Sequence, residues 1–150
     1  MCSTKFTVAR FCRLDPLANH ILPKDFKKYY IIPAPPEEVY TALTNPLSIE
    51  IWTGDETVMS TEAGSEFSLW GGSIVGKNLE FEEGKKIVQQ WYFDGEPDIS
   101  VVTIKLHPAK SNATSVELRH TNIPDKEYDN FASGWDEYYF GPLAEFFEGF

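Results

Sequence analysis

The sequence contains few residues of the types that bind metals or form disulfides. It has two cysteines, Cys2 and Cys12, whose spacing matches no zinc or redox motif. Its three histidines, His20, His107 and His120, are far apart along the chain. We therefore expect two reduced thiols and no metal site.

Long apolar runs and an excess of positive charge are also absent. No stretch of about 18 apolar residues occurs, so we expect no membrane insertion. The opening segment MCSTKFTVARFCRLDP lacks the continuous apolar core of a signal peptide, and this predicts a cytoplasmic protein. The net charge of −10 argues against a nucleic acid partner, because affinity for phosphates comes from Lys and Arg.

No motif indicates a cofactor or a catalytic centre. The glycines of GGSIVG, at 71–76, do not have the spacing of a phosphate-binding loop. The acidic segment DGEPD, at 94–98, offers too few ligands for a calcium loop. No nucleophile stands with a paired base. The sequence therefore predicts no cofactor and no catalytic residue, and it favours a protein that is not an enzyme.

The charges are distributed unevenly along the chain. Residues 1–28 hold six Lys or Arg and two acids, a net charge of +4, whereas the remainder holds seven and 21, a net charge of −14. The apolar residues of 1–24 follow no long period, and Pro16 and Pro23 interrupt them. We expect an N-terminal extension at 1–24 and one domain at 25–150. The basic arm either stays solvated or docks on an acidic surface.

A strand and a helix begin the regular pattern. The β-forming residues at 29–32 predict a first strand that ends at Pro33. The following segment, PAPPEEVYTALTNP, predicts a helix with Pro36 in its first turn and a stop at 45–46. Two glutamates favour its N-terminal end. LSIEIWTG adds a short helical turn before Gly54.

From 56 to 123 the apolar residues alternate with a period of two. EFSLWGG places Phe67 and Leu69 on one face of a strand. SIVGKNLEFEEGKKIVQQWYF predicts a hairpin that turns at EEGK, and SVVTIKLHPAKSNATSVELRHTNI predicts a second hairpin that turns at PAKSNA. The alternation indicates an antiparallel sheet with one dry face and one wet face.

The last segment, FASGWDEYYFGPLAEFFEGF, is the most aromatic. At the angular spacing of an α-helix it forms one apolar stripe, made of Phe131, Trp135, Tyr138, Tyr139, Pro142, Phe146 and Phe150. Ser133, Glu137 and Glu148 lie opposite, and Gly141-Pro142 predicts a bend. The stripe needs the dry face of the sheet as its partner. The sequence thus predicts an α+β helix-grip fold, in which a curved antiparallel sheet wraps around a long C-terminal helix.

Between such a sheet and helix we expect either a pocket or a packed core. A pocket would hold a small apolar molecule. Its predicted walls are Trp52, Phe67, Leu69, Gln89, Trp91, His120, Phe131, Trp135 and Tyr138. His120 is either a group for the ligand's polar head or a core histidine satisfied by a neighbouring hydroxyl or carbonyl. Trp70 has the opposite strand parity to Phe67, so it is either exposed or shifted by a bulge at Gly71-Gly72.

Four segments together resemble one known family. They are APPEEVYTALTNP, GSIVGKNLEFEEGKKIVQQWYF, VELRHTNIP and GWDEYYFGPLAEFFE. From about 26 to 150 the chain is similar to the START and birch-pollen-allergen superfamily (SRPBCC). Within it, the chain most resembles the family named for the C-terminal domain of the heat-shock protein 90 ATPase activator.

The resemblance implies a cavity between sheet and helix, and three classes of function. The first is the binding or sensing of a small hydrophobic ligand. The second is an interaction domain for a chaperone or another protein, and the third is a cyclase-like enzyme with His120 as acid or base. The eukaryotic activators also have a separate N-terminal domain, for which these residues leave no room.

Overall fold

The computed structural model describes residues 23–93 and 99–149. Several parts of the sequence lie outside these ranges. They are nearly all of the predicted extension at 1–24, with both cysteines and His20, the acidic segment 94–98, and Phe150. The described elements are β1 (Lys24–Ile32), α1 (Pro36–Thr44), α2 (Pro46–Thr53), β2 (Glu66–Leu69), η2 (Trp70–Gly72), β3 (Ile74–Glu82), β4 (Lys86–Trp91), β5 (Ser100–Ala109), η3 (Lys110–Asn112), β6 (Ala113–Ile123), α3 (Asp125–Gly134), η4 (Trp135–Phe140) and α4 (Gly141–Glu148).

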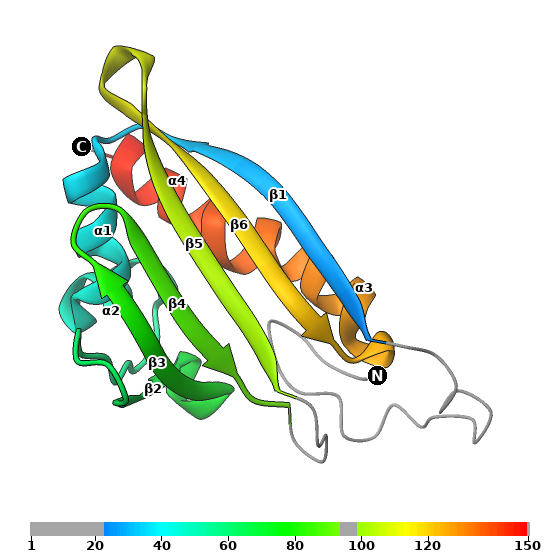
Figure 1. The fold of residues 1–150 in the computed structure, drawn as a ribbon. Helices are drawn as coiled ribbons and strands as arrows, with labels where there is room; N and C mark the ends of the chain where they lie inside the picture. The colour runs from blue at the N-terminus through cyan, green and yellow to red at the C-terminus, as the bar shows by residue number, and fades with distance from the viewer. Residues whose placement is uncertain (1–22, 94–98, 150) are drawn as a thin grey trace.

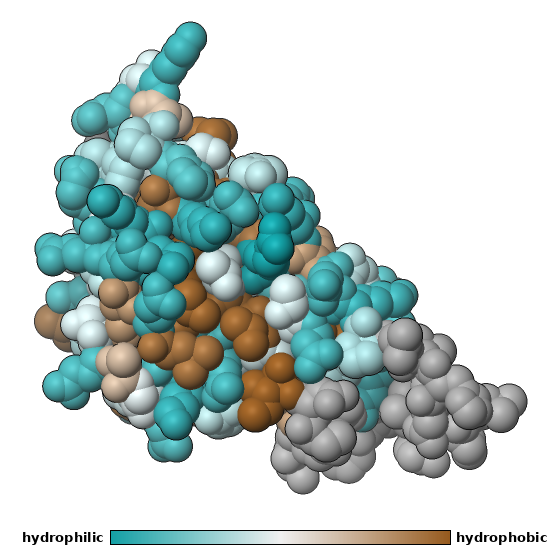
Figure 2. Space-filling view, viewed as in Figure 1, coloured by the Kyte–Doolittle hydropathy of each residue, from teal (hydrophilic) through white to brown (hydrophobic). Residues whose placement is uncertain are grey.

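The strands form one six-stranded antiparallel sheet in the order β1-β6-β5-β4-β3-β2. The C-terminal helical segment crosses one face of the curved sheet, and α1 and α2 close one end (Figure 1). The other face carries mostly polar side chains around one apolar patch (Figure 2). The predicted helix-grip fold is confirmed.

Both predicted hairpins are present with the predicted turns. β3 and β4 join at 83–85, and β5 and β6 join through η3. Alternate residues of β4 and β5 are buried, as the period of two requires. A bulge at Leu79 shifts the register between β3 and β4. The first strand is longer than predicted, because β1 pairs with β6 from Lys24 onward.

Proline and asparagine set the ends of α1 and α2. Pro36 begins α1, where a missing N–H costs no helical hydrogen bond. The Asn45 side chain accepts hydrogen bonds from the backbone N–H groups of Leu47 and Ser48 at 2.9 and 3.2 Å, so it caps α2. Gly54 ends α2 in the left-handed region, at φ 81°. The predicted short turn is thus a second helix of eight residues.

The C-terminal segment is continuous but changes geometry along its length. α3 has 10 residues, the π-helical η4 has six and α4 has eight. The backbone N–H of Gly141 donates to the carbonyl oxygen of Asp136, five residues earlier. At Gly141-Pro142, where the sequence predicts a bend, the helix changes from π to α geometry.

Edge strand β1 is attached to this helix by polar and aromatic contacts. The Tyr30 hydroxyl donates to the Asp136 carboxylate at 2.6 Å, and Lys28 Nζ donates to both of its oxygens at 2.9 Å. The Tyr30 ring stacks on Phe140 with centroids 4.4 Å apart. The contacts hold the helix across the sheet at its middle.

Candidate functional site

Aromatic rings fill the space between the sheet and the C-terminal helix. Trp91 from β4 and Trp135 from η4 have centroids 4.7 Å apart. Phe131 lies 6.3 Å from Trp91, and Tyr139 lies 4.7 Å from Trp135. All four side chains are buried, with 0 to 4% of their surface exposed. The predicted ring-lined wall therefore exists as a packed cluster.

His120 lies inside this cluster with both ring nitrogens hydrogen-bonded. Trp135 Nε1 donates to His120 Nδ1 at 3.1 Å, so Nδ1 is the acceptor. His120 Nε2 lies 2.9 Å from Ser100 Oγ, and the Ser100 hydroxyl donates to the Trp91 carbonyl at 2.8 Å. Nε2 therefore carries the proton and donates to Ser100. Together the bonds join the helix to β4, β5 and β6.

Burial keeps this imidazole neutral. His120 is fully buried, and the desolvation of the charged ring lowers its pKa from 6.5 to about 3. A base that works near neutral pH needs a pKa close to the ambient pH. In this environment His120 is suited to a structural role, the second of its two predicted roles.

A second buried polar chain connects the sheet to the segment before β2. Trp91 Nε1 donates to Gln89 Oε1 at 2.9 Å, and Gln89 Nε2 donates to Asn78 Oδ1 at 2.9 Å. Asn78 Nδ2 then donates to Ser65 Oγ at 3.0 Å and to the Ser60 carbonyl at 3.2 Å. The side chain of Gln89, a predicted wall residue, is thus hydrogen-bonded to protein partners.

The other predicted site residues lie around the same core. Seven of the nine predicted residues have apolar or aromatic side chains. Tyr138 is half-buried, and the other six are buried: Trp52, Phe67, Leu69, Trp91, Phe131 and Trp135. Trp52, expected near a pocket mouth, donates from Nε1 to the Ala42 carbonyl at 2.8 Å and so attaches α2 to α1. A small molecule in this region would need these rings to separate, and its binding stays a prediction.

Several core residues were missing from the predicted wall, among them Trp70, Tyr139, Phe140 and Leu143. Trp70 is 5% exposed and has φ 51°, followed by Gly71 and Gly72 with φ 61° and 99°. The left-handed turn η2 brings the indole to within 6.2 Å of Tyr139, measured between ring centroids. The Gly71-Gly72 pair was the sequence signal for this change of direction.

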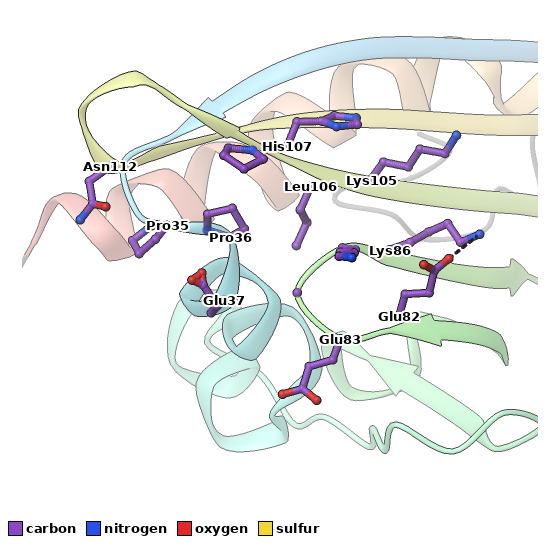
Figure 3. A pocket seen from close by; sticks show the side chains of 13 residues that line it. Pro35, Pro36, Glu37, Glu82, Glu83, Lys86, Lys105, Leu106, His107 and Asn112 are labelled. Carbon is purple, nitrogen blue, oxygen red and sulfur yellow. Dashed lines mark ion pairs between the residues drawn. The ribbon is translucent and has the colours of Figure 1, made fainter.

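A groove lies at the surface, away from the ring cluster. It is a groove of about 860 Å³ between the start of α1, the β3–β4 turn and the end of β5 (Figure 3). Pro35, Pro36 and Leu106 supply apolar lining, and charged side chains of both signs form the rim. Lys86 at this rim is held by Glu82 at 2.9 Å and by Glu80 at 2.6 Å. None of the lining residues was predicted as part of a site.

The described residues offer neither a metal site nor a membrane-spanning helix. Within 23–93 and 99–149, no group of three or more His, Cys, Asp or Glu side chains is placed to hold a metal ion. In the same part of the chain, no helix combines the length and the apolar character needed to cross a bilayer.

A family model and several relatives of this chain carry the name of one family. A model described as Activator of Hsp90 ATPase homolog 1-like protein matches residues 33–148. The Activator of 90 kDa heat shock protein ATPase homolog of Dictyostelium discoideum is 34% identical over 102 residues, which are 67% of this chain and 27% of the relative. The Hsp90 co-chaperone AHA1 of Saccharomyces cerevisiae is 25% identical over 112 residues, 70% of this chain and 32% of the relative.

A solved structure matches over nearly its whole length. The crystal structure of an HSP90 activator from Plasmodium falciparum superposes with a TM-score of 0.76 at 27% identity, covering 83% of this chain and 96% of the solved one. By contrast, the chain spans about a quarter to a third of the length of the curated relatives named above. The chain belongs to the family of Activator of Hsp90 ATPase homolog 1-like proteins.

Proposed function

We propose that this chain is a protein-interaction domain that binds a 90 kDa heat-shock protein and stimulates its ATPase. The observation that carries the proposal is the match to the Plasmodium falciparum chain, which is named an HSP90 activator and is covered over 96% of its length. That chain is of similar size to this one. This match supports the proposal that a domain of this size stimulates the chaperone's ATPase without the additional length of the longer relatives.

The interior of the domain favours this function over the other two classes. The polar groups that a ligand or substrate would need, on Gln89 and His120, are bonded to protein atoms. The rings around them are in mutual contact. A molecule with such a closed interior recognises partners mainly through its surface.

The proposal is tested with the purified full chain and the purified 90 kDa heat-shock protein of the same organism. Steady-state ATP hydrolysis is measured with increasing amounts of the chain, and an inhibitor of the chaperone's ATP site gives the background rate. We expect the rate to rise and saturate. An unchanged rate together with no binding in a calorimetric titration would refute the proposal.

The small-ligand alternative is tested on the same material. The mass of the purified protein is compared under native and denaturing conditions. A mass lost on denaturation would identify a bound molecule and favour a carrier or sensor. For a domain whose interior is filled by its own rings, we expect equal masses.

A further inference from the structure

One row of side chains on the outer face of the sheet is apolar and exposed. Val75 pairs with Ser68, Ser68 bridges to Val58, and the backbone N–H of Tyr92 donates to the Val75 carbonyl. Val58 and Val75 are 62% and 42% exposed. A groove of about 400 Å³ lies along this row. We call Val58, Val75 and Tyr92 the apolar row, and it lies at the β2 edge of the sheet.

Further exposed hydrophobic side chains lie on the same face. Ile99 is 43% exposed and precedes Ser100, whose side chain points into the core, so Ile99 faces outward beside the apolar row. Tyr29 and Ile31 are 56% and 63% exposed, but they belong to β1 at the opposite edge of the sheet and lie outside this patch. Brown side chains accordingly gather on this face among teal ones (Figure 2). Such a patch rimmed by polar groups is typical of a protein-binding surface.

The outer face carries charges of both signs, and Glu66 lines the groove at Val75, although the chain as a whole has a net charge of −10. The strand register places five cations on this face: Lys27, Lys77, Lys86, Lys105 and Arg119. It places four carboxylates there: Glu66, Glu80, Glu82 and Glu117. Within the described ranges, Lys77, Lys105 and Arg119 form no ion pair. Lys77 and Lys105 nevertheless lie directly opposite Glu66 and Glu117, whereas Arg119 lies opposite Lys27 and Thr103.

Two pairs of these cations lie on directly opposite positions of neighbouring strands. Lys86 lies directly opposite Lys105, and Lys27 lies directly opposite Arg119. Like charges in directly opposed positions destabilise a strand pair. Carboxylates compensate Lys86 at 2.6 and 2.9 Å and Lys27 at 3.9 Å, and Lys105 lies directly opposite Glu117 in the register of β5 and β6. Among these four cations, Arg119 alone lacks both an ion pair within the described ranges and a directly opposite carboxylate.

We propose that this outer face, centred on the apolar row, binds an acidic surface of a partner protein that presents an apolar side chain. The apolar side chain enters the groove at Val75, and carboxylates pair with Lys77 and Arg119. The inference rests on the proposed function, since it names the surface that contacts the chaperone.

The first test does not depend on the chaperone. A short peptide of glutamates with one central leucine is titrated into the isotope-labelled full chain, and backbone amide shifts are followed by NMR. We expect shifts at Val75, Lys77 and Arg119 and none at Leu47 or Ile51, which are equally apolar and 71% and 69% exposed on α2. A peptide with central serine should shift the Val75 region less. Absence of shifts on the outer face at millimolar peptide would overturn the proposal.

The second test uses the 90 kDa heat-shock protein. Val75→Glu and Lys77→Glu should each weaken binding about tenfold, because a charge replaces an apolar contact or meets a like charge. Leu47→Glu and Lys110→Glu are the matched controls away from this face and should bind like the original chain. Added salt should weaken binding by the original chain more than binding by Lys77→Glu. Circular dichroism melting confirms that each variant is folded.

The two tests separate the inference from the proposed function. If the chaperone does not bind but the peptide shifts map to the outer face, the proposed function fails and the surface stands. If the chaperone binds, and Leu47→Glu weakens this binding while Val75→Glu does not, the proposed binding surface is wrong and the proposed function stands. Concentration-dependent dimerisation abolished by Val75→Glu would make this face an interface between copies, and that also overturns the inference.

Discussion

The neutral state of His120 predicts how folding stability depends on pH. In the folded chain the pKa of this ring is lowered by burial to about 3, whereas the ordinary value is 6.5. Between these values the unfolded chain binds a proton that the folded chain does not. The stability contribution is therefore complete above pH 6.5 and is lost as the pH falls toward the folded value.

The size of this effect follows from the ordinary pKa of 6.5. Each pH unit well below that value costs about 1.4 kcal/mol of unfolding free energy, so the loss from about pH 7.5 to about pH 5 is roughly 2 kcal/mol. Carboxylates also titrate as the pH falls, and their contribution must be removed. A variant that lacks only the imidazole provides this subtraction.

The assay is urea unfolding of the original chain and of His120→Leu at both pH values. Between about pH 7.5 and about pH 5, the unfolding free energy of the original chain should fall by about 2 kcal/mol more than that of the variant. His120→Leu itself should be less stable at neutral pH by about 1–3 kcal/mol, because Trp135 Nε1 loses its acceptor. His120→Gln, which retains an acceptor, is the second variant if His120→Leu does not fold. Equal losses in original and variant chains, or an NMR titration of His120 near pH 6.5, would refute the reasoning.

Two further predictions concern the C-terminal helix. Gly141→Ala should destabilise the fold by about 1–3 kcal/mol, because an added Cβ would press on the Asp136 carbonyl inside the π turn. The matched control is Gly149→Ala, whose Cβ meets Glu145 O at an ordinary 3.6 Å; equal melting temperatures for the two variants would contradict this account. Asp136→Asn should cost about 0.5–1 kcal/mol at neutral pH, as for other exposed ion pairs. Partial burial raises the pKa of Asp136, but hydrogen bonds from Tyr30 and Lys28 lower it below 3.8 overall. The difference in unfolding free energy between Asp136→Asn and the original chain should therefore be present above pH 3.8 and disappear in more acidic solution. A difference in unfolding free energy that stays constant across that pH range, measured by urea unfolding, would argue against this role of Asp136.

The fold was predictable because its signals are local and repeated. Alternation in β4 and β5 fixed which side chains face the helix, and the turn residues fixed the hairpins. Proline at both ends of α1 fixed its bounds to within a residue or two. Each of these features depends on a few neighbouring residues, so it can be predicted from the sequence alone.

The site was predictable only as a set of residues. Strand parity correctly placed His120 and Gln89 inside, but it says nothing of the partners that satisfy them. Ser100 and Trp135 are 20 and 15 residues from His120 in sequence. Whether the aromatic rings leave a cavity between sheet and helix depends on the summed volumes of side chains from several strands and helices. The periodicity of apolar residues in the sequence does not report these volumes.

The helix stripe shows how one local change redirects distant side chains. At a constant 100° per residue, Phe140 lies about 180° from Phe131, on the face predicted to be exposed. The structure buries Phe140 at 1% exposure and Leu143 at 0%, because the π turn η4 contains additional residues and rotates the stripe that follows it. Pro142 gives the reason for the wider turn, since it has no N–H for the carbonyl of Tyr138. Gly141 leaves room for the Asp136 carbonyl, so the pair that predicted a bend also determines which rings face the sheet.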